Sequence, residues 1–209
     1  MTMSKLKSIT SVLAILLLLS PLAATPHEMG PVGPDGREIV CDLPQAEKKH
    51  NVGGRDGAGL CVFTSIEYAG RWQHVLPLFD FQKDMTQEDG GGWPDKVDDM
   101  LKKYAPSVAY IQDTTGDPKI LELALKTGRM PCVTYDGHDC HYSGTIGHMI
   151  CLVYLDDQYA AVTDNNFPED EQVTWMTRDE FLARWRGNGG GWTVILLSPP
   201  PPPLPHNHK

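Results

Sequence analysis

Residues 57–66 read Gly57-Ala58-Gly59-Leu60-Cys61-Val62-Phe63-Thr64-Ser65-Ile66, where a glycine-rich loop changes into a segment with helical periodicity. Val62, Ile66, Ala69 and Gln73 recur at the spacing of one helix face, so a helix is expected from about Cys61 to Trp72. A cysteine in the first turn of a helix meets unpaired backbone N–H groups and the positive end of the helix dipole. Both favour the thiolate, which is the nucleophilic form of this side chain.

A nucleophilic cysteine needs a base within hydrogen-bond reach and a third group that holds the base in position. Of the eight histidines, His148 begins an apolar run, residues 148–155, that reads as a buried central strand. The chain turns at Asp156-Asp157, and residues 159–163 return as the partner strand of a hairpin. An antiparallel hairpin folds its far end back beside its start, so we expect Asp164 next to His148, where its carboxylate would orient the imidazole.

The remaining periodicity predicts helices first and an antiparallel sheet afterwards, which is an α+β arrangement. A second helix is expected to start at Pro94 and to end before Pro106, and a third to cover residues 118–126 with Gly128 as its C-terminal cap. Later elements are a strand over 130–135, a loop over 136–147, a helix over 178–185 that begins with a Thr177–Glu180 capping box, and a strand over 192–197.

Other candidate sites have weaker support in the sequence. His138-Asp139-Cys140-His141 contains the residue types that bind zinc, but a metal site needs fixed spacing and a second pair of ligands, so no metal is expected. Ser65 and Ser143 lack the strand-turn-helix context of a serine nucleophile. Cysteine chemistry needs no cofactor, and none is expected.

Composition and charge narrow the class of protein. The formal net charge of −9 argues against nucleic-acid binding, which requires clustered Lys and Arg. Residues 1–24 have the layout of a secretory signal peptide, with Lys5 and Lys7 before an apolar core over 12–19 and small residues at 22–24. That core is shorter than the about 20 residues that span a bilayer, and no later run is long enough. We therefore expect an exported protein, periplasmic or secreted, without a stable membrane span after signal removal.

The rest of the chain is expected to form one domain, residues 25–198, followed by a proline-rich tail over 199–209 that reads as disordered. Five cysteines leave at least one thiol unpaired in an exported protein. A bridge from Cys41 to either Cys132 or Cys140 stays open, and Cys151 reads as a core residue. The unpaired thiol is most simply Cys61.

With these residues in this order, the chain resembles the papain-like cysteine peptidase superfamily, and within it the peptidase domains that process double-glycine leader peptides. The resemblance covers about residues 50–197 and implies a helical half, with a central nucleophile helix, packed on a C-terminal antiparallel sheet. It implies a catalytic triad of Cys61, His148 and Asp164, with the adjacent Asn165 as an alternative orienter. Downstream, residues 173–175 and 180–182 resemble the closing strand and helix of the leader peptidases.

The resemblance also implies residues that contact the substrate. Gly91, Gly92 and Trp93 lie in a glycine stretch similar to one that pairs with extended substrate in the family. The family places a glutamine of the oxyanion hole six residues before the nucleophile, where this chain has Arg55. Arg55 has donors and a positive charge that could serve the same role, and Asn51 is a second candidate.

The expected function is that of an exported cysteine peptidase that cleaves an extended peptide or protein substrate through a thioester intermediate. Acyl transfer to an amine is the same chemistry with a different second nucleophile. Two other hypotheses remain from the sequence: a catalytically inactive papain-like binding module, and an amidase or acyltransferase of related fold.

Overall fold

The computed structural model describes residues 32–169 and 173–201. The expected signal peptide, residues 1–24, and residues 202–209 of the expected tail lie outside the described residues. Within the described part of the chain, no helix is both long and apolar enough to cross a membrane.

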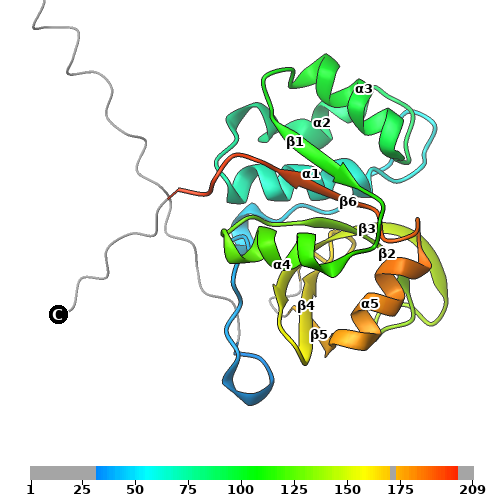
Figure 1. The fold of residues 1–209 in the computed structure, drawn as a ribbon. Helices are drawn as coiled ribbons and strands as arrows, with labels where there is room; N and C mark the ends of the chain where they lie inside the picture. The colour runs from blue at the N-terminus through cyan, green and yellow to red at the C-terminus, as the bar shows by residue number, and fades with distance from the viewer. Residues whose placement is uncertain (1–31, 170–172, 202–209) are drawn as a thin grey trace, which may run out of the picture. The chain divides into compact units, whose positions relative to one another are not determined.

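A six-stranded antiparallel sheet forms one part of the fold, in the order β1-β6-β2-β3-β4-β5 (Figure 1). The long strand β3 lies between β2 and β4, in the interior of the sheet. Its residues 148–153 are buried, as their continuous apolar sequence predicts. The strands are β1 (Tyr110–Asp113), β2 (Cys132–Gly137), β3 (Thr145–Leu155), β4 (Tyr159–Thr163), β5 (Thr174–Thr177) and β6 (Thr193–Leu196).

The helices are α1 (Cys61–Trp72), α2 (Phe81–Met85), α3 (Pro94–Tyr104), α4 (Pro118–Lys126) and α5 (Arg178–Gly187). Helix α1 starts and ends where its periodicity predicts. All of its residues except Arg71 are buried, so it is a core helix rather than a surface helix. The predicted capping box is present at the start of α5, where Thr177 and Glu180 satisfy each other's backbone N–H groups.

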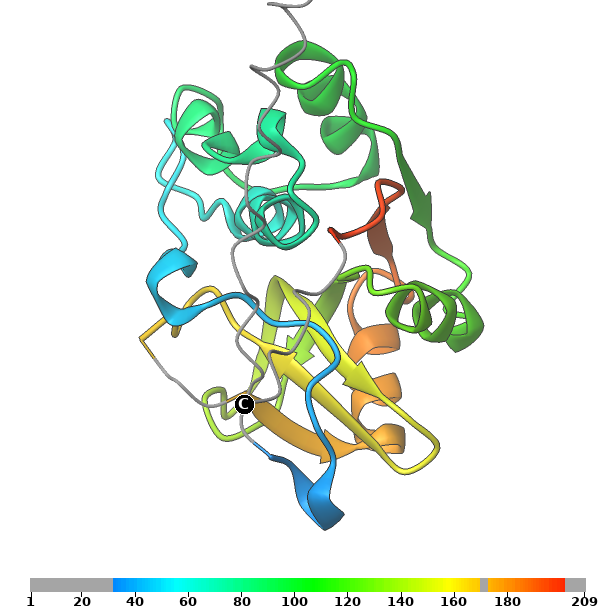
Figure 2. The same ribbon diagram turned by 90° about the vertical axis from the view of Figure 1, so that its left-hand side faces the viewer.

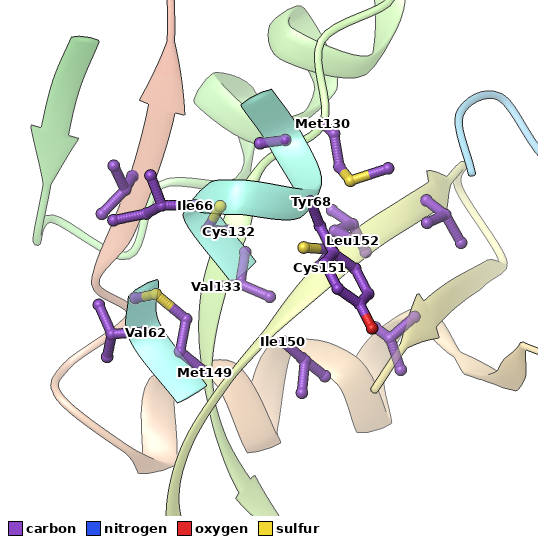
Figure 3. Close-up of a cluster of buried hydrophobic side chains, with 14 of the residues drawn as sticks. Val62, Ile66, Tyr68, Met130, Cys132, Val133, Met149, Ile150, Cys151 and Leu152 are labelled. Carbon is purple, nitrogen blue, oxygen red and sulfur yellow. The ribbon is translucent and has the colours of Figure 1, made fainter. Parts of the chain in front are cut away.

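The core lies between α1 and the sheet. Val62, Ile66 and Tyr68 of α1 face residues 149–152 of β3 and Cys132 and Val133 of β2 (Figure 3). At one edge of the sheet, β5 pairs with β4 of the β3–β4 hairpin. Helix α5 packs against β2, β4 and β5 (Figure 2). This packing places the start of α1 beside the start of the buried part of β3.

Three expectations about these elements need correction. Strand β3 begins at Thr145, three residues before His148, so His148 is the first buried residue of the strand and not its first residue. Neither β1 nor α2, with four and five residues, was predicted. All five cysteines are free thiols, so Cys41 is bridged to neither Cys132 nor Cys140.

Candidate active site

Cys61 is the first residue of α1, as its sequence context predicts. Leu60, which precedes the helix, provides no side-chain cap, so the backbone N–H groups of the first turn are left to other partners. The residue is only 8% exposed, yet it lines a cleft of about 630 Å³. Its thiol is therefore at the positive end of a helix and within reach of a molecule in that cleft.

His148 and Asp164 are neighbours, in the arrangement that the hairpin predicts. The register pairs Cys151 of β3 with Thr163 of β4, which brings the end of β4 back towards His148. His148 Nε2 lies 2.7 Å from Asp164 Oδ1, and both side chains are buried. An ionised carboxylate can only accept, so Nε2 carries a proton and donates it to Asp164.

His148 also interacts with the side chain of Cys61. Burial disfavours the imidazolium, but hydrogen bonds to Asp164 and Cys61 outweigh burial and raise the pKa of His148 to about 9. Burial acts in the opposite direction on Asp164, yet its bond with His148 and further bonds from Asn166 and Tyr142 hold the pKa of Asp164 below its usual value. The geometry therefore favours a charged pair of imidazolium and carboxylate beside the thiol.

Two residues that the sequence did not identify complete this arrangement. The Tyr142 hydroxyl donates to Asp164 Oδ2 at 2.8 Å, and the backbone N–H of Asn166 donates to Asp164 Oδ1 at 2.8 Å. Tyr142 comes from the loop between β2 and β3, which has no periodic pattern to mark it. Asn166 is within the Asp164-Asn165-Asn166 run, so its position was visible in the sequence but its role was not.

Asn165 does not orient His148; that bond belongs to Asp164. The two hydrogens of the Asn165 amide nitrogen are instead shared among three acceptors, Cys61 O at 3.1 Å, Ser65 Oγ at 2.9 Å and Met149 O at 3.0 Å. It connects the first turn of α1 to β3. The expectation of Asn165 as an alternative orienter was wrong because consecutive residues after a strand point in different directions.

Arg55 does not face the cleft. Its guanidinium is exposed and pairs with Asp89, with Nη2 2.6 Å from Asp89 Oδ1. Residues 53 and 59 form an isolated antiparallel bridge, so the chain makes a narrow turn between them with Arg55 near its tip. The charge pair and the turn both direct Arg55 away from Cys61, and the expectation that it contributes to an oxyanion hole was wrong.

Asn51, the second candidate, does line the cleft. The Gly53–Gly59 bridge and the bond from Leu60 N–H to Val52 O place residue 51 opposite residue 61. Asn51 Oδ1 also accepts from Leu60 N–H at 2.8 Å, and Nδ2 donates to Asn166 Oδ1 at 3.0 Å. An amide nitrogen has two hydrogens, so one is left for an acceptor in the cleft.

Gly91, Gly92 and Trp93 line the opposite wall of the cleft. Gly91 donates its backbone N–H to Gly59 O at 2.7 Å, so this N–H stabilises the nucleophile loop and is not available to a substrate. Trp93 is 53% exposed, and Lys96 Nζ lies 5.0 Å from the centroid of its ring. The wall therefore presents a glycine backbone and an aromatic surface.

The described residues that line the cleft include no Asp, Glu, Lys or Arg. Thr114, Ile146 and Trp192, which the sequence did not single out, contribute to its walls. No group of three His, Cys, Asp or Glu side chains within the described ranges is arranged to hold a metal ion. Asp139 is instead bonded to Tyr135 Oη at 2.7 Å.

Neither a protein-family model nor a curated protein sequence matches this chain. Among solved structures, it is similar to the crystal structure of a candidate C39-like peptidase from Bacillus anthracis, with a TM-score of 0.52 and 14% sequence identity. The similarity covers 79% of this chain and 100% of that protein. The chain therefore has a mixed helix and antiparallel-sheet fold that is similar to the fold of that C39-like peptidase.

Proposed function

We propose that this chain is a cysteine peptidase that cleaves a peptide bound in an extended conformation. The observation that carries the proposal is the contact of His148 Nε2 with Asp164 Oδ1, at 2.7 Å, together with the interaction of His148 with Cys61. All three are buried residues, and Cys61 and His148 line one cleft. A nucleophile, a base and an orienter in that order are what acyl transfer from an amide requires. The structural similarity to a C39-like peptidase supports the same reaction class.

Acylation would start when the Cys61 thiol gives its proton to His148, which leaves a thiolate beside an imidazolium. The sulfur attacks the scissile carbonyl carbon and forms a C–S bond, and the carbonyl oxygen takes up negative charge. His148 then gives its proton to the leaving amine as the C–N bond breaks. Asp164 keeps the other ring nitrogen protonated, so that the nitrogen that faces Cys61 is the one that exchanges the proton.

The oxyanion would be bound by the backbone N–H of Cys61 and by the second hydrogen of Asn51 Nδ2. The Cys61 N–H is in the first turn of α1, and Asn51 lies opposite Cys61 in the preceding loop. The dipole of α1 also favours negative charge at this place. Water activated by His148 would then attack the thioester and release the acid product. If an amine replaces the water, the product is a new amide and the residues keep the same roles.

The walls of the cleft support a substrate class. Because its lining residues carry no Asp, Glu, Lys or Arg, we propose that uncharged side chains flank the scissile bond. Apart from Cys61 and His148, whose charges pair with each other and with Asp164, nothing in the lining would offer a charged side chain an opposite charge for its lost hydration. Trp93 and Trp192 offer flat apolar surface to aromatic or aliphatic side chains.

A thiol-labelling experiment tests the nucleophile directly. The protein is treated with iodoacetamide at pH 6–7 for a short time and analysed by peptide mass spectrometry. Cys61 should be alkylated at least tenfold faster than Cys140, which is an exposed free thiol and serves as an internal reference. His148→Ala should remove the difference, because the thiol then loses its imidazolium partner. Equal rates for Cys61 and Cys140 in the wild type would end the proposal.

A peptide library identifies the reaction. Peptides with uncharged residues around one amide bond should be cleaved, and Cys61→Ala should lower turnover by about 10³-fold or more. A library that stays intact while a peptidoglycan fragment is cleaved would replace the peptidase with an amidase. New amides formed with an added amine would indicate an acyltransferase. A labelled Cys61 with no turnover of any of these would indicate a binding module.

Export remains a proposal based on the sequence. N-terminal sequencing of the protein recovered from outside the cytoplasm should find a chain that begins close to Thr25. A protein that keeps residues 1–24 and stays in the cytoplasm would contradict it.

A further inference from the structure

We propose that Tyr142 is a positioning residue that fixes the Asp164 carboxylate, and through it His148, by closing a ring of hydrogen bonds around the site. This inference rests on the proposed function, since it concerns the same Cys61–His148 pair. Tyr142 Oη lies 2.8 Å from Asp164 Oδ2 and 2.9 Å from Asn166 Nδ2. It comes from the β2–β3 loop, outside the elements that carry the three proposed catalytic residues.

The directions of these bonds are fixed by their chemistry. An amide nitrogen can only donate, so the Asn166 side chain gives a hydrogen to Tyr142 Oη. The single hydroxyl hydrogen of Tyr142 is therefore directed to Asp164 Oδ2. Asp164 Oδ1 receives His148 Nε2–H and the Asn166 backbone N–H. Both carboxylate oxygens are occupied by donors, which holds the plane of the carboxylate in place.

The same bonds continue to the nucleophile loop. Asn166 Oδ1 accepts from Asn51 Nδ2 at 3.0 Å, and Asn51 Oδ1 accepts from Leu60 N–H at 2.8 Å. Leu60 is covalently joined to Cys61, and Cys61 interacts with His148, so the ring closes. Each side-chain amide in this ring donates with its nitrogen and accepts with its oxygen. A displacement of Tyr142 would therefore affect the base, the orienter and an oxyanion donor together.

The Tyr142 ring adds a packing contact. Its centroid lies 5.9 Å from that of His148 at an interplanar angle of 61°, and 5.6 Å from that of Phe167. The ring of His141 stacks on that of Phe167, with their centroids 4.2 Å apart. Tyr142 lines the cleft together with His148, and its ring covers part of the surface of His148. Excluding water strengthens the bond between the two charged groups.

The charged and titratable groups around this site come from several elements. His148 faces Asp164 after β4, Cys61 at the start of α1, and Tyr142 from the β2–β3 loop. Tyr142 also interacts with Asp139 and His141 of its own loop. Without the Tyr142 donor, the Asp164 carboxylate would take up a proton at a higher pH. The imidazolium would then lose its counter-charge in less acid solution than in the wild type.

The test compares Tyr142→Phe with Tyr154→Phe. Tyr154 donates its hydroxyl to Asp156 Oδ2 at 2.8 Å, so this control removes the same kind of Tyr–Asp bond away from the site. We measure the rate of Cys61 alkylation by iodoacetamide from pH 3 to pH 10. The acid limb is the part of this curve where the alkylation rate rises from its value at low pH. In Tyr142→Phe the acid limb should move to higher pH by on the order of one unit. Tyr154→Phe should leave it in place.

Peptide hydrolysis gives the second measurement. Tyr142→Phe should lower kcat about tenfold and leave KM within about twofold, because the base is misplaced while the cleft is kept. An unmoved acid limb in a folded Tyr142→Phe protein, whatever its kcat, would overturn the inference. If that variant does not fold, Asn166→Ala decides. It removes the amide that donates to Tyr142 Oη, so a smaller shift in the same direction is expected, and none would overturn the inference.

The two proposals fail separately. Alkylation needs no peptide substrate, so the acid limb can be measured even if no peptide is cleaved, and in that case only the proposed peptidase activity fails. Cleavage of peptides by both Tyr142→Phe and wild type with identical pH profiles leaves the peptidase proposal standing and removes the role of Tyr142.

Discussion

His148 is in contact with the carboxylate of Asp164 and interacts with the thiol of Cys61, and these two partners decide how it titrates. Burial lowers the pKa of a histidine, but here the two contacts outweigh burial and raise the pKa to about 9. A histidine in the unfolded chain titrates near about 6.5. Between these two pKa values, His148 is therefore charged in the folded protein and neutral in the unfolded chain.

This difference predicts a pH dependence of stability. The contribution of His148 to the free energy of unfolding is fully present below about pH 6.5 and is lost as the pH rises through about 9. His148→Gln keeps a donor towards Asp164 but does not titrate. The Tm difference between wild type and His148→Gln should therefore shrink between pH 7 and pH 10. Parallel Tm curves over this range would show that His148 titrates at its ordinary pKa.

Asn51 and Arg55 give opposite predictions for the oxyanion. Asn51→Ala removes a donor at the start of α1 and should lower kcat by about 10²–10³-fold with little change in KM. Arg55→Ala removes only an exposed pair with Asp89, so its kcat should stay within about twofold of wild type. The Tm of each variant is measured to confirm folding. A larger loss of kcat in Arg55→Ala than in Asn51→Ala would reverse the assignment.

Among single residues, the sequence predicted the His148–Asp164 pair, which depends on strand pairing. It did not predict the position of Arg55, which depends on the conformation of a loop. His148 and Asp164 are brought together by hairpin register, which follows from the lengths of two apolar runs. Arg55 was chosen by its distance along the chain from Cys61. The narrow turn between Gly53 and Gly59 makes residue 51, not residue 55, the neighbour of residue 61.

The nucleophile loop and the glycine stretch before α3 pack backbone against backbone. A Cβ on Gly90 would lie 2.0 Å from Ala58 O, and one on Gly54 would lie 2.5 Å from Gly90 N. Bonds from Gly91 N–H to Gly59 O and from Arg55 N–H to Glu88 O, both at 2.7 Å, hold the two segments together. Glycine is needed here because the segments approach so closely.

Gly90→Ala should therefore move the loop that ends at Cys61. We expect a lower Tm and a loss of Cys61 alkylation rate of about tenfold or more, because the thiol is displaced from His148. Gly144→Ala is the matched control. Like Gly90, Gly144 does not have a positive φ, but a Cβ there meets no atom within 4 Å. Gly90→Ala with a normal alkylation rate would show that the loop adapts without moving Cys61.

The strands β2 and β3 place two cysteines directly opposite each other. Cys132 pairs with Cys151, and the bond from Leu152 N–H to Pro131 O makes this a pair without hydrogen bonds of its own. Such pairs have Cα atoms about 4.5 Å apart, within the range of about 4.4–6.8 Å that a disulfide requires. The structure therefore favours a different pair from those that the sequence left open.

Oxidised glutathione should link Cys132 to Cys151. The two thiols lose their hydrogens, one S–S bond forms, and the oxidant is reduced to two molecules of glutathione. Peptide mapping without reductant should find this link, and Cys41→Ala should not prevent it. Because both thiols are buried, the reaction should speed up under mild denaturation. A link from Cys41 to either residue would contradict the register.

Elements were predicted well where one pattern is sustained. Helix α1, the β3–β4 hairpin and the capping box of α5 follow from periodicity and local side-chain chemistry. Strand β1 was missed because its four residues are paired only at one side, with β6, and are stabilised by that tertiary contact. Helix α2 is a single turn that depends on packing of Phe81 against Phe63 of α1.

The proposed active site lies where a helix meets a sheet, so its geometry depends on how firmly these two layers are joined. Asn165 is the side chain that joins them at this point. Its amide nitrogen contacts Cys61 O and Ser65 Oγ of α1 and Met149 O of β3, and Ser65 Oγ itself donates to Met149 O at 2.9 Å. Both Asn165 and Ser65 are buried. The sequence pattern could suggest Asn165 only as a polar residue beside Asp164, because its partners are distant in the chain.

Asn165→Ala should weaken the connection between helix α1 and strand β3 of the sheet. It leaves buried acceptors without their donor and should lower the free energy of unfolding by about 1–3 kcal/mol. Thr193→Val is the matched control, since it removes a buried bond of 2.8 Å to Cys132 O within the sheet. Both variants should lose stability, but only Asn165→Ala should also slow Cys61 alkylation, because only it releases the first turn of α1 from β3. Equal alkylation rates in the two variants would mean that packing between α1 and the sheet holds Cys61 against His148 without Asn165.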